Sequence, residues 1–420
     1  MIRVLHTSDW HLGASLHDEK RTYEFQRWLD WLRQAIVDHH IDVLLVAGDV
    51  FDVANPSIDA RKMYYNFLAN ISKDGQCKNV IITAGNHDSA ALLEAPKEIL
   101  ATLQTSVIGQ ACKSIQDEVI SVSIHGDDPD LIVCAVPFLP SRDVCKSLPG
   151  ETPEDHVNHY RDGVANHYAE VAKYATQLRN KLRNKSARHI PIIAMGHLYV
   201  AGATVTDTQL QVVGNLNGMS ADIFGSSFDY IALGHIHKPQ IVDDNPFIRY
   251  CGAPIPISFS ECQDTKTACI ISFDDSNHTP QIETIEIPCF QKMKSIEATS
   301  LDEIKEKLAF CIEESSTSGE SIWVQVNCKS DKFIPSLSDT IKEMLKDTKV
   351  NCLRVTNRAL VNAYLRNENN HAEVSLNELT PEDVFNRLLN AMQVGDDKTN
   401  AYRLAFKTIL EELANQGIKS

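Results

Sequence analysis

Residues 81–90 read IITAGNHDSA, and the apolar run at their start ends abruptly in Gly85-Asn86-His87-Asp88. Glycine, asparagine and aspartate are common in the turn that follows a strand, so a turn alone would explain this tetrapeptide. Loops at the carboxyl ends of strands are also where α/β proteins place binding and catalytic residues. Whether the tetrapeptide is a turn or a site therefore depends on the rest of the chain.

Short runs of apolar and β-branched residues recur through the first two-thirds of the chain. They lie at 2–6, 42–47, 79–84, 131–136, 191–195 and 230–233. Most are continuously apolar, which is typical of strands buried on both faces. Helical segments at 22–38 and 57–72 separate the early runs. This alternation predicts a layered α/β domain.

The pattern changes near residue 288. Helix-like segments at 301–315 and 336–347 alternate with strand-like segments at 321–326 and 350–356. These segments predict a small α+β module. A polar stretch then precedes two amphipathic helical segments, the first of which has a capping threonine and a proline at its start. We therefore expect four parts: a main domain at 1–287, a module at 288–365, a linker at 366–379 and a helical hairpin at 380–420.

The composition narrows the class of protein. The chain has 420 residues, a formal net charge of −16 and eleven cysteines without Cys-x-x-Cys spacing. Its first residues lack the apolar run of a secretory signal, and no stretch approaches the roughly 20 apolar residues of a membrane span. We therefore expect a cytoplasmic protein with reduced thiols and no membrane partner. The acidic charge disfavours a nucleic-acid partner, although bound divalent cations and local basic regions would offset it.

Five of the predicted strands are followed by side chains that can bind metal ions. These are Asp9 and His11, Asp49 and Asp52, Asn86 to Asp88, His197, and His235 and His237. Each motif alone could be structural, but five in succession at strand ends indicate a shared site. Carboxylate, imidazole and amide donors suit manganese, iron or zinc, and the absence of cysteine argues against a structural zinc site. Two ions about 3.5–4 Å apart can clamp both oxygens of an in-line displacement at phosphorus.

The order of motifs resembles the calcineurin-like metallophosphoesterases: Asp-x-His, Gly-Asp-x-x-Asp, Gly-Asn-His-Asp/Glu, Gly-His and Gly-His-x-His, all intact here. The resemblance implies a β-sandwich flanked by helices and two bound metal ions. It implies that the first ion is held by Asp9, His11, Asp49 and His237. The second would be held by Asp49, Asn86, His197 and His235, with Asp49 bridging.

The resemblance gives His87 a different role. In this family the corresponding histidine is not a ligand but faces the substrate, where it stabilises the transition state and protonates the leaving oxygen. Asp52 is expected to orient and charge His87. In archaeal and eukaryotic nuclease relatives a histidine tends to occupy the position of Asp52, so this chain departs from their pattern there. For Asp88 the sequence leaves open whether it is only a turn residue.

Longer stretches are similar to the SbcD family of bacterial nuclease subunits. They are HTSDWHLG at 6–13, AGDVFD at 47–52, AGNHDS at 84–89, DYIALGHIHKPQ at 229–240, RYCGAPIPISFSE at 249–261 and LTPEDVFNRLL at 379–389. The similarity covers essentially the full length, least clearly at 294–356. It implies a manganese-dependent exonuclease on double-stranded DNA ends that also cuts single strands and hairpins, in end processing, recombination and replication. Magnesium, iron or zinc are alternatives to manganese.

The same resemblance implies partners. The module would cap DNA, and the C-terminal hairpin would dock on SbcC, an SMC-like ATPase, in a nucleoid-associated heterotetramer that contains a homodimer of this chain. The sequence has no Gly-Lys dipeptide and hence no P-loop, so any ATP dependence must come from a partner. The helix with Tyr64, Tyr65, Phe67 and Leu68 serves either dimerisation or core packing. The basic run at 179–189 is either a solvated helix end or a phosphate contact.

Two other functions fit part of the pattern. The first is hydrolysis of a small nucleotide or phosphodiester by the same fold, and the second is a metal-free scaffold. The complete set of ligand types argues against the scaffold. The C-terminal helical pair argues against the small-molecule hydrolase.

Overall fold

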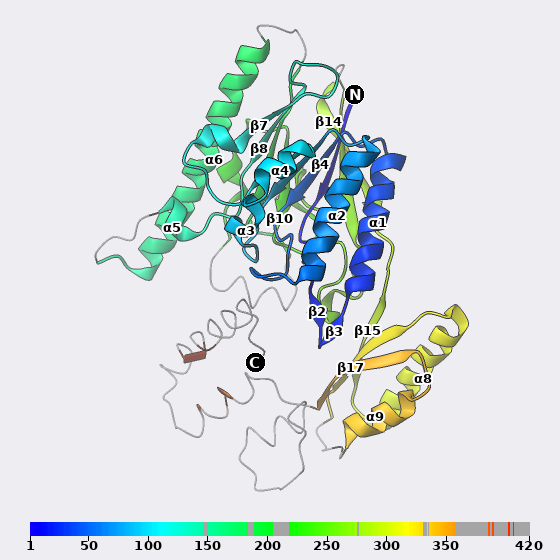
Figure 1. Cartoon of the computed structure of the whole chain (residues 1–420). Coiled ribbons are helices and arrows are strands. Elements are labelled where there is room, and N and C mark those ends of the chain that lie inside the picture. The colour runs from blue at the N-terminus through cyan, green and yellow to red at the C-terminus, as the bar shows by residue number, and fades with distance from the viewer. Residues whose placement is uncertain are drawn as a thin grey trace. The chain divides into compact units, whose positions relative to one another are not determined.

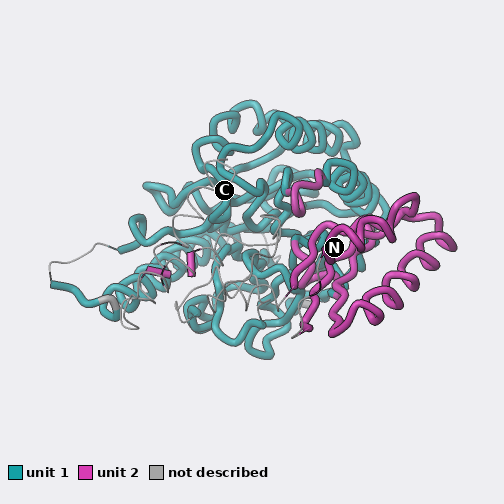
Figure 2. The backbone as a smooth tube through the Cα atoms, turned by 90° about the horizontal axis from the view of Figure 1, so that it is seen from below, with its two compact units in different colours: residues 1–14, 21–257, 264–289 teal, residues 15–20, 258–263, 290–420 magenta. Residues whose placement is uncertain are grey.

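The computed structural model describes most of the chain as two compact units (Figure 2). Unit 1 comprises residues 1–14, 21–257 and 264–289, and unit 2 comprises residues 15–20, 258–263 and 290–420. The described residues are 1–145, 150–183, 189–204, 218–274, 277–330, 334, 336–357, Phe385, Asn386, Leu389, Tyr402, Arg403 and Phe406. The predicted linker at 366–379 and most of the predicted hairpin at 380–420 lie outside this set.

The first sheet of unit 1 has six strands in the order β14-β13-β1-β4-β5-β6. Their bounds are β1 (Ile2–Thr7), β4 (Val43–Ala47), β5 (Asn79–Thr83), β6 (Thr105–Ile108), β13 (Thr267–Asp274) and β14 (Asn277–Glu286). Strands β1, β4, β5 and β6 are parallel, and β13 joins them antiparallel to β1. The carboxyl ends of the four parallel strands therefore lie at one edge of the sheet.

The second sheet also has six strands, in the order β11-β12-β10-β9-β8-β7. Their bounds are β7 (Val119–Val122), β8 (Leu131–Ala135), β9 (Ile192–His197), β10 (Tyr230–Gly234), β11 (Gln240–Val242) and β12 (Asn245–Tyr250). Strands β8, β9, β10 and β12 are parallel. Alternate side chains of the two sheets, such as Val43 and Leu45 with Val133 and Ile193, form one buried cluster between them. The unit is therefore a β-sandwich.

Helices cover the outer faces of this sandwich (Figure 1). On the first sheet, α1 (Thr22–Asp38) and α2 (Ile58–Asp74) pack against each other, and α3 (Ala90–Glu94) and α4 (Lys97–Thr102) lie beside β6. On the second sheet, α6 (Pro153–Arg183) contributes to a second buried cluster. The short elements are α5 (Ser141–Val144) and the 3₁₀ turns η1 (Ile115–Glu118), η2 (Ala221–Phe224) and η3 (Phe259–Glu261).

Helix α2 shows why the local sequence forms these elements. The hydroxyl of Ser57 accepts a hydrogen bond from the Ala60 N–H at its start, and Gly75 closes it with φ of 70°. Its buried side chains recur every three or four residues and include Tyr64, Phe67 and Leu68. This face serves the core of unit 1, which favours the core-packing interpretation of these residues.

Unit 2 contains a three-stranded parallel sheet in the order β15-β16-β17. Its elements are β15 (Lys292–Ala298), α8 (Leu301–Ser318), β16 (Ile322–Cys328), α9 (Leu337–Leu345) and β17 (Val350–Asn357). Each helix connects two neighbouring parallel strands, so the unit is built from two βαβ crossovers. The hairpin of β2 (Ser15–Leu16) and β3 (Glu19–Lys20) also belongs to it, because Leu16 packs with Phe259 and Met293.

The predicted fold class is confirmed, and the strands and helices expected before residue 358 lie within a few residues of their predicted bounds. In the basic run, Arg179 lies 3.6 Å from a carboxylate oxygen of Asp229, which supports a structural role for that residue. Near the C-terminus, the rings of Phe385 and Phe406 stack with their centroids 3.8 Å apart. Among the described residues, no helix combines the length and apolar character needed to cross a membrane. The predicted domain bounds stay a prediction.

Candidate metal centre

The candidate site lies at the carboxyl ends of five strands of unit 1. Strands β1, β4 and β5 are neighbours in the first sheet, and β9 and β10 are neighbours in the second. Parallel strands deliver the loops that follow them to one edge of a sheet, so these five loops converge. The side chains predicted from the five motifs are therefore brought together, although they come from residues 9 to 237 of the chain.

A first group of donors is formed by Asp9, His11 and His237, whose ligand atoms lie within 4.8 Å of one another. The Nε2 atoms of His11 and His237 are 3.2 Å apart. Two nitrogens that bind the same ion, each at a distance of about 2.1 Å, lie about 3 Å from one another. The spacing of the two Nε2 atoms therefore suits a shared metal ion.

A second group surrounds the amide oxygen of Asn86. This Oδ1 lies 3.1 Å from Nε2 of His197 and 3.0 Å from Nδ1 of His235. Asp49 lies beside both groups, because its Oδ2 is 3.2 Å from Nε2 of His197 and 3.6 Å from Nε2 of His11. A carboxylate in this position can bridge two ions.

Hydrogen bonds orient the imidazole rings for metal binding. Nδ1 of His197 lies 2.9 Å from the backbone oxygen of Ala47. A carbonyl oxygen can only accept, so Nδ1 carries the proton and Nε2 is left as a metal ligand. At His11 a charge contact takes this place, because Nδ1 lies 3.3 Å from the carboxylate of Asp52, and Nε2 lies 3.2 Å from Nε2 of His237. Such contacts fix the tautomer and orientation of metal-binding histidines.

His87 is anchored differently from these rings. Its Nδ1 lies 2.8 Å from the backbone carbonyl oxygen of Asp52, and its N–H donates to Oδ1 of Asp49 at 2.9 Å. The hydrogen bond from the ring thus goes to the main chain of Asp52, whereas the carboxylate of Asp52 lies beside His11. The expected pairing of His87 with the Asp52 side chain stays a prediction.

Asp88, whose role the sequence left open, links the loop after β4 to the loop after β5. Its carboxylate accepts hydrogen bonds from the N–H groups of Val50 at 3.0 Å, Phe51 at 2.9 Å and Gly85 at 2.9 Å. These donors flank Asp49 in one loop and Asn86 in the other. Burial and the nearby Asp49 charge raise the pKa of Asp88 to about 6. It is therefore more than a local turn residue.

The glycines of the motifs leave room for the ligands. A Cβ on Gly48 would lie 2.1 Å from Nδ1 of His197, and a Cβ on Gly85 would lie 2.1 Å from Oδ1 of Asp49. Several ligand residues also have positive φ: Asp9 at 51°, His11 at 45°, Asp49 at 48° and His235 at 93°. Backbone strain of this kind is common at functional sites, where the surrounding structure sustains it.

The site holds opposed charges at short range. Burial favours neutral His197, but the carboxylates of Asp49 and Asp9 together with the Ala47 carbonyl raise the pKa of His197 to about 9. Burial lowers the pKa of His235 to about 3. Burial also favours neutral Asp49, yet the imidazoles of His197 and His87 hold the pKa of this carboxyl well below its usual range. Metal binding here requires neutral imidazoles and charged carboxylates, so it would release protons.

Around the ligands lie residues that the motif pattern did not single out. The Ser8 hydroxyl donates to Oδ2 of Asp9 at 2.5 Å, and the Lys266 ammonium donates to the backbone oxygen of His237 at 3.2 Å. A serine before a ligand and a lysine 29 residues after one have no periodic or compositional signal. Only the tertiary contacts assign them to the site.

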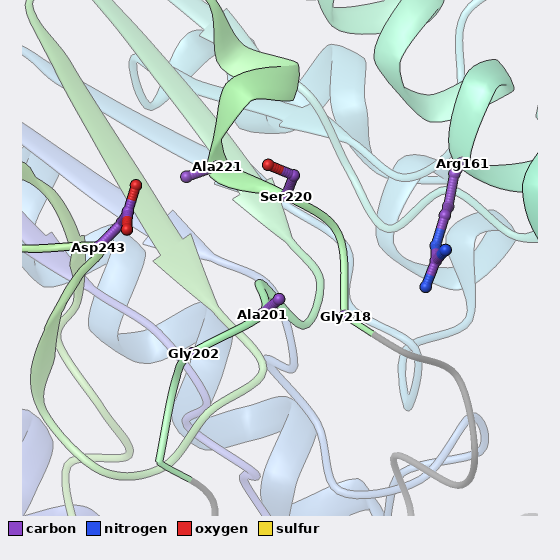
Figure 3. A pocket seen from close by; sticks show the side chains of 7 residues that line it. All are labelled: Arg161, Ala201, Gly202, Gly218, Ser220, Ala221 and Asp243. Atoms are coloured by element: carbon purple, nitrogen blue, oxygen red, sulfur yellow. The ribbon is translucent and has the colours of Figure 1, made fainter.

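A separate hollow of about 460 Å³ lies elsewhere in unit 1 (Figure 3). It is lined by Arg161, Ala201, Gly202, Gly218, Ser220, Ala221 and Asp243. None of these lining residues belongs to the five motifs, so we assign this hollow no part in the metal centre.

Comparison with known proteins agrees with this geometry. Residues 2–239 match the calcineurin-like phosphoesterase family, and residues 289–393 match the type 5 capsule protein repressor C-terminal domain. The SbcD subunit of the nuclease SbcCD from Escherichia coli strain K12 is 32% identical over 420 residues, which are 99% of each chain. The SbcD subunit from Rhodobacter capsulatus is 34% identical over 273 residues, covering 62% of this chain and 64% of the relative.

Among solved structures, TT1561 of Thermus thermophilus has a TM-score of 0.35 and 14% identity over 68% of this chain and 99% of that chain. This similarity is too weak to bear on the fold. The assignment of this chain to a family rests on the sequence relatives. The chain belongs to the calcineurin-like phosphoesterase family, in the group of SbcD subunits of SbcCD nucleases, and is a hydrolase of phosphodiester bonds that depends on divalent metal ions.

Proposed function

We propose that this chain is the nuclease subunit of an ATP-dependent complex and cuts DNA with two bound manganese ions. It acts as an exonuclease on double-stranded ends and as an endonuclease on single strands and hairpins. The observation that carries the proposal is the position of the Asp49 carboxylate, whose Oδ2 lies 3.6 Å from His11 in one group of donors and 3.2 Å from His197 in the other.

The ligands divide into two sets around that carboxylate. The first metal ion would be held by Asp9, His11, Asp49 and His237, and the second by Asp49, Asn86, His197 and His235. When bound, the two ions polarise the phosphate and provide a water nucleophile at neutral pH. The neutral amide of Asn86 limits the negative charge that faces an anionic phosphodiester. Carboxylate, imidazole and amide donors together favour manganese over magnesium, which prefers oxygen ligands alone.

His87 is the proposed general acid. Its Nδ1–H donates a hydrogen bond to the carbonyl oxygen of Asp52 at 2.8 Å. Nε2 is therefore the nitrogen that can give a proton to the leaving oxygen. The hydrogen bond from the His87 N–H to Asp49 holds this residue beside the bridging carboxylate. Asp52 supports the acid through its main chain and supports His11 through its side chain.

The partners follow from the family. A relative that matches 99% of this chain is named as a subunit of the nuclease SbcCD, so we propose SbcC as the ATPase partner of this chain. Residues 288–365 would cap the DNA and 380–420 would dock on the ATPase. The assembly would be a heterotetramer containing two copies of this chain, located at the nucleoid in the cytoplasm.

One assay tests the proposal. End-labelled duplex DNA is incubated with the chain and manganese, with and without the ATPase partner and ATP, and bis(p-nitrophenyl) phosphate is tested in parallel. We expect degradation of the duplex that needs manganese and is strongly stimulated by the partner. Cleavage of the small ester alone would instead indicate a small-molecule hydrolase. A wild-type chain that binds no metal would indicate a scaffold.

A further inference from the structure

The segment RYCGAPIPISFSE at 249–261 is among the stretches shared with the SbcD family, yet it supplies no proposed ligand. Its residues Cys251, Gly252 and Ala253 follow β12 and are all buried in unit 1. We call these three residues the 251–253 turn. Their contacts lie against two of the proposed ligands of the first metal ion, Asp9 and His237.

On one side, the turn holds the main chain of His237. The N–H of Ala253 donates to the His237 carbonyl oxygen at 3.1 Å, and the Lys266 ammonium donates to the same oxygen at 3.2 Å. Lys266 is only 5% exposed, so this bond is sheltered from water. A carbonyl that accepts two hydrogen bonds has little freedom to rotate, and its residue is held in one orientation.

Gly252 allows the 251–253 turn to lie close to the main chain of His237. Its φ is +82°, and a Cβ at this position would lie 2.6 Å from the His237 carbonyl oxygen and 2.7 Å from the ring of Pro239. The obstructing atoms are backbone oxygen and a rigid ring, so they cannot move aside as a flexible side chain would. A side chain at residue 252 would therefore displace His237 or the turn itself.

On its other side, the turn reaches Asp9 through Ser8. The Ser8 hydroxyl donates to Oδ2 of Asp9 at 2.5 Å, since a carboxylate can only accept, and the Cys251 Sγ lies 3.1 Å from the same hydroxyl. Ser8 and Cys251 are fully buried. The remaining Asp9 oxygen, Oδ1, accepts from the His235 N–H at 2.9 Å. Both oxygens of Asp9 are thus fixed.

The geometry points to a positioning element for the first metal ion, made of the 251–253 turn with Ser8 and Lys266. It joins Asp9, which follows a strand of the first sheet, to His237, which follows a strand of the second. The residues of the element contact proposed ligands and are not themselves proposed ligands, so they act as positioning residues. This inference rests on the proposed two-metal function, because it assigns the element to one of the two ions.

The positioning element is tested at each of the two metal sites separately, by titrating variants of the purified full-length chain with manganese. Asn86→Ala removes a ligand of the second ion and should leave a chain that binds only the first. His11→Ala should leave a chain that binds only the second. Ser8→Ala in the Asn86→Ala background should weaken manganese binding about 10–100-fold, the usual effect of removing a group that orients a metal ligand. In the His11→Ala background the loss should be several-fold smaller, because Asp9 is not a proposed ligand of the second ion and reaches it only through the His235 N–H.

Gly252→Ala should give the same selective loss. Its matched control is Gly75→Ala, because Gly75 has φ of +70° and a Cβ there meets nothing within 4 Å. Both variants carry the cost of a left-handed alanine, but only Gly252→Ala pushes against His237. Ser220→Ala is the control for Ser8→Ala, since it removes a hydroxyl that donates to Asp222 at 3.1 Å.

The outcomes separate this inference from the proposed function. A wild-type chain that does not bind two manganese ions would contradict the function itself. Two ions in the wild type, with equal losses in both backgrounds or no loss in either, would overturn the positioning element alone. Should Gly252→Ala fail to fold, Ser8→Ala carries the test by itself.

Discussion

Nδ1 of His87 lies 2.8 Å from the backbone carbonyl oxygen of Asp52, while the carboxylate of Asp52 lies 3.3 Å from Nδ1 of His11. One residue therefore orients two imidazoles, through its main chain on one side and its side chain on the other. No substitution of the Asp52 side chain removes the carbonyl that orients His87. The carboxylate and the carbonyl can consequently be separated by experiment.

Asp52→Asn should weaken manganese binding about 10–100-fold, because the change removes the negative charge beside His11. At saturating manganese the rate should approach that of the wild type, with the same pH dependence, because His87 keeps its carbonyl partner. Titration calorimetry and a pH–rate profile measure the two effects. Normal manganese affinity with a slow rate at every metal concentration would show that the carboxylate acts on His87 instead.

Asp49→Asn should weaken binding of both ions and abolish hydrolysis, because its carboxylate contacts both groups of donors. Elemental analysis after dialysis measures the bound manganese. A chelator should also remove the wild-type activity, and added manganese should restore it. Persistent wild-type activity in metal-free buffer would rule out the two-metal mechanism.

His87→Ala should slow cleavage by about 10²–10⁴-fold, the usual contribution of a positioned general acid. The manganese content should stay near the wild-type value, because the ring nitrogen of His87 is not a proposed ligand. The two measurements are a single-turnover rate and elemental analysis of the same preparation. Loss of one ion would show that His87 is a ligand.

Asp88→Asn should destabilise the fold by about 1–3 kcal/mol, because an amide cannot accept hydrogen bonds on both of its ends. It should also weaken manganese binding, since the three donors flank Asp49 and Asn86. The control is Asp130→Asn, because Oδ2 of Asp130 alone accepts from the N–H groups of Ile124 at 2.8 Å and His125 at 2.9 Å, so an amide oxygen can keep both bonds. Urea unfolding and manganese titration should show both the stability loss and the metal defect in Asp88→Asn, and neither in Asp130→Asn.

His6 should make the metal-free chain sensitive to acid. Burial lowers the pKa of His6 from 6.5 to about 3. At a pH between these two values, His6 is therefore protonated in the unfolded chain but neutral in the folded chain. Its contribution to stability is complete above pH 6.5 and is lost as the pH falls. Between about pH 7 and pH 5, the wild type should lose about 2 kcal/mol more of its unfolding free energy than His6→Gln. Urea titrations with a chelator measure this, and parallel losses in the two proteins would contradict it.

The sequence by itself determined the buried strands of the layered α/β domain and the types of donor at its metal centre. Continuous apolar runs such as 42–47 and 79–84 specify buried strands, because burial on both faces excludes polar residues. Each motif directly follows its strand, so the chain order of the motifs also defines the strand ends that carry them. These properties depend only on short stretches of sequence, so they can be recognised without the tertiary structure. The predicted ligands Asp9, His11 and His237 converge for this reason.

Only the tertiary structure decided which atoms orient the ligands. The Asp52 carbonyl that holds His87 is 35 residues away along the chain, and Cys251 is 243 residues from Ser8. The roles of Asp88, Ser8 and Lys266 depend on contacts to backbone N–H and carbonyl groups or to single side-chain atoms. Every residue except proline carries the same backbone donor and acceptor. Such a contact leaves no mark in the pattern of side chains and exists only once the folded strands bring the loops together.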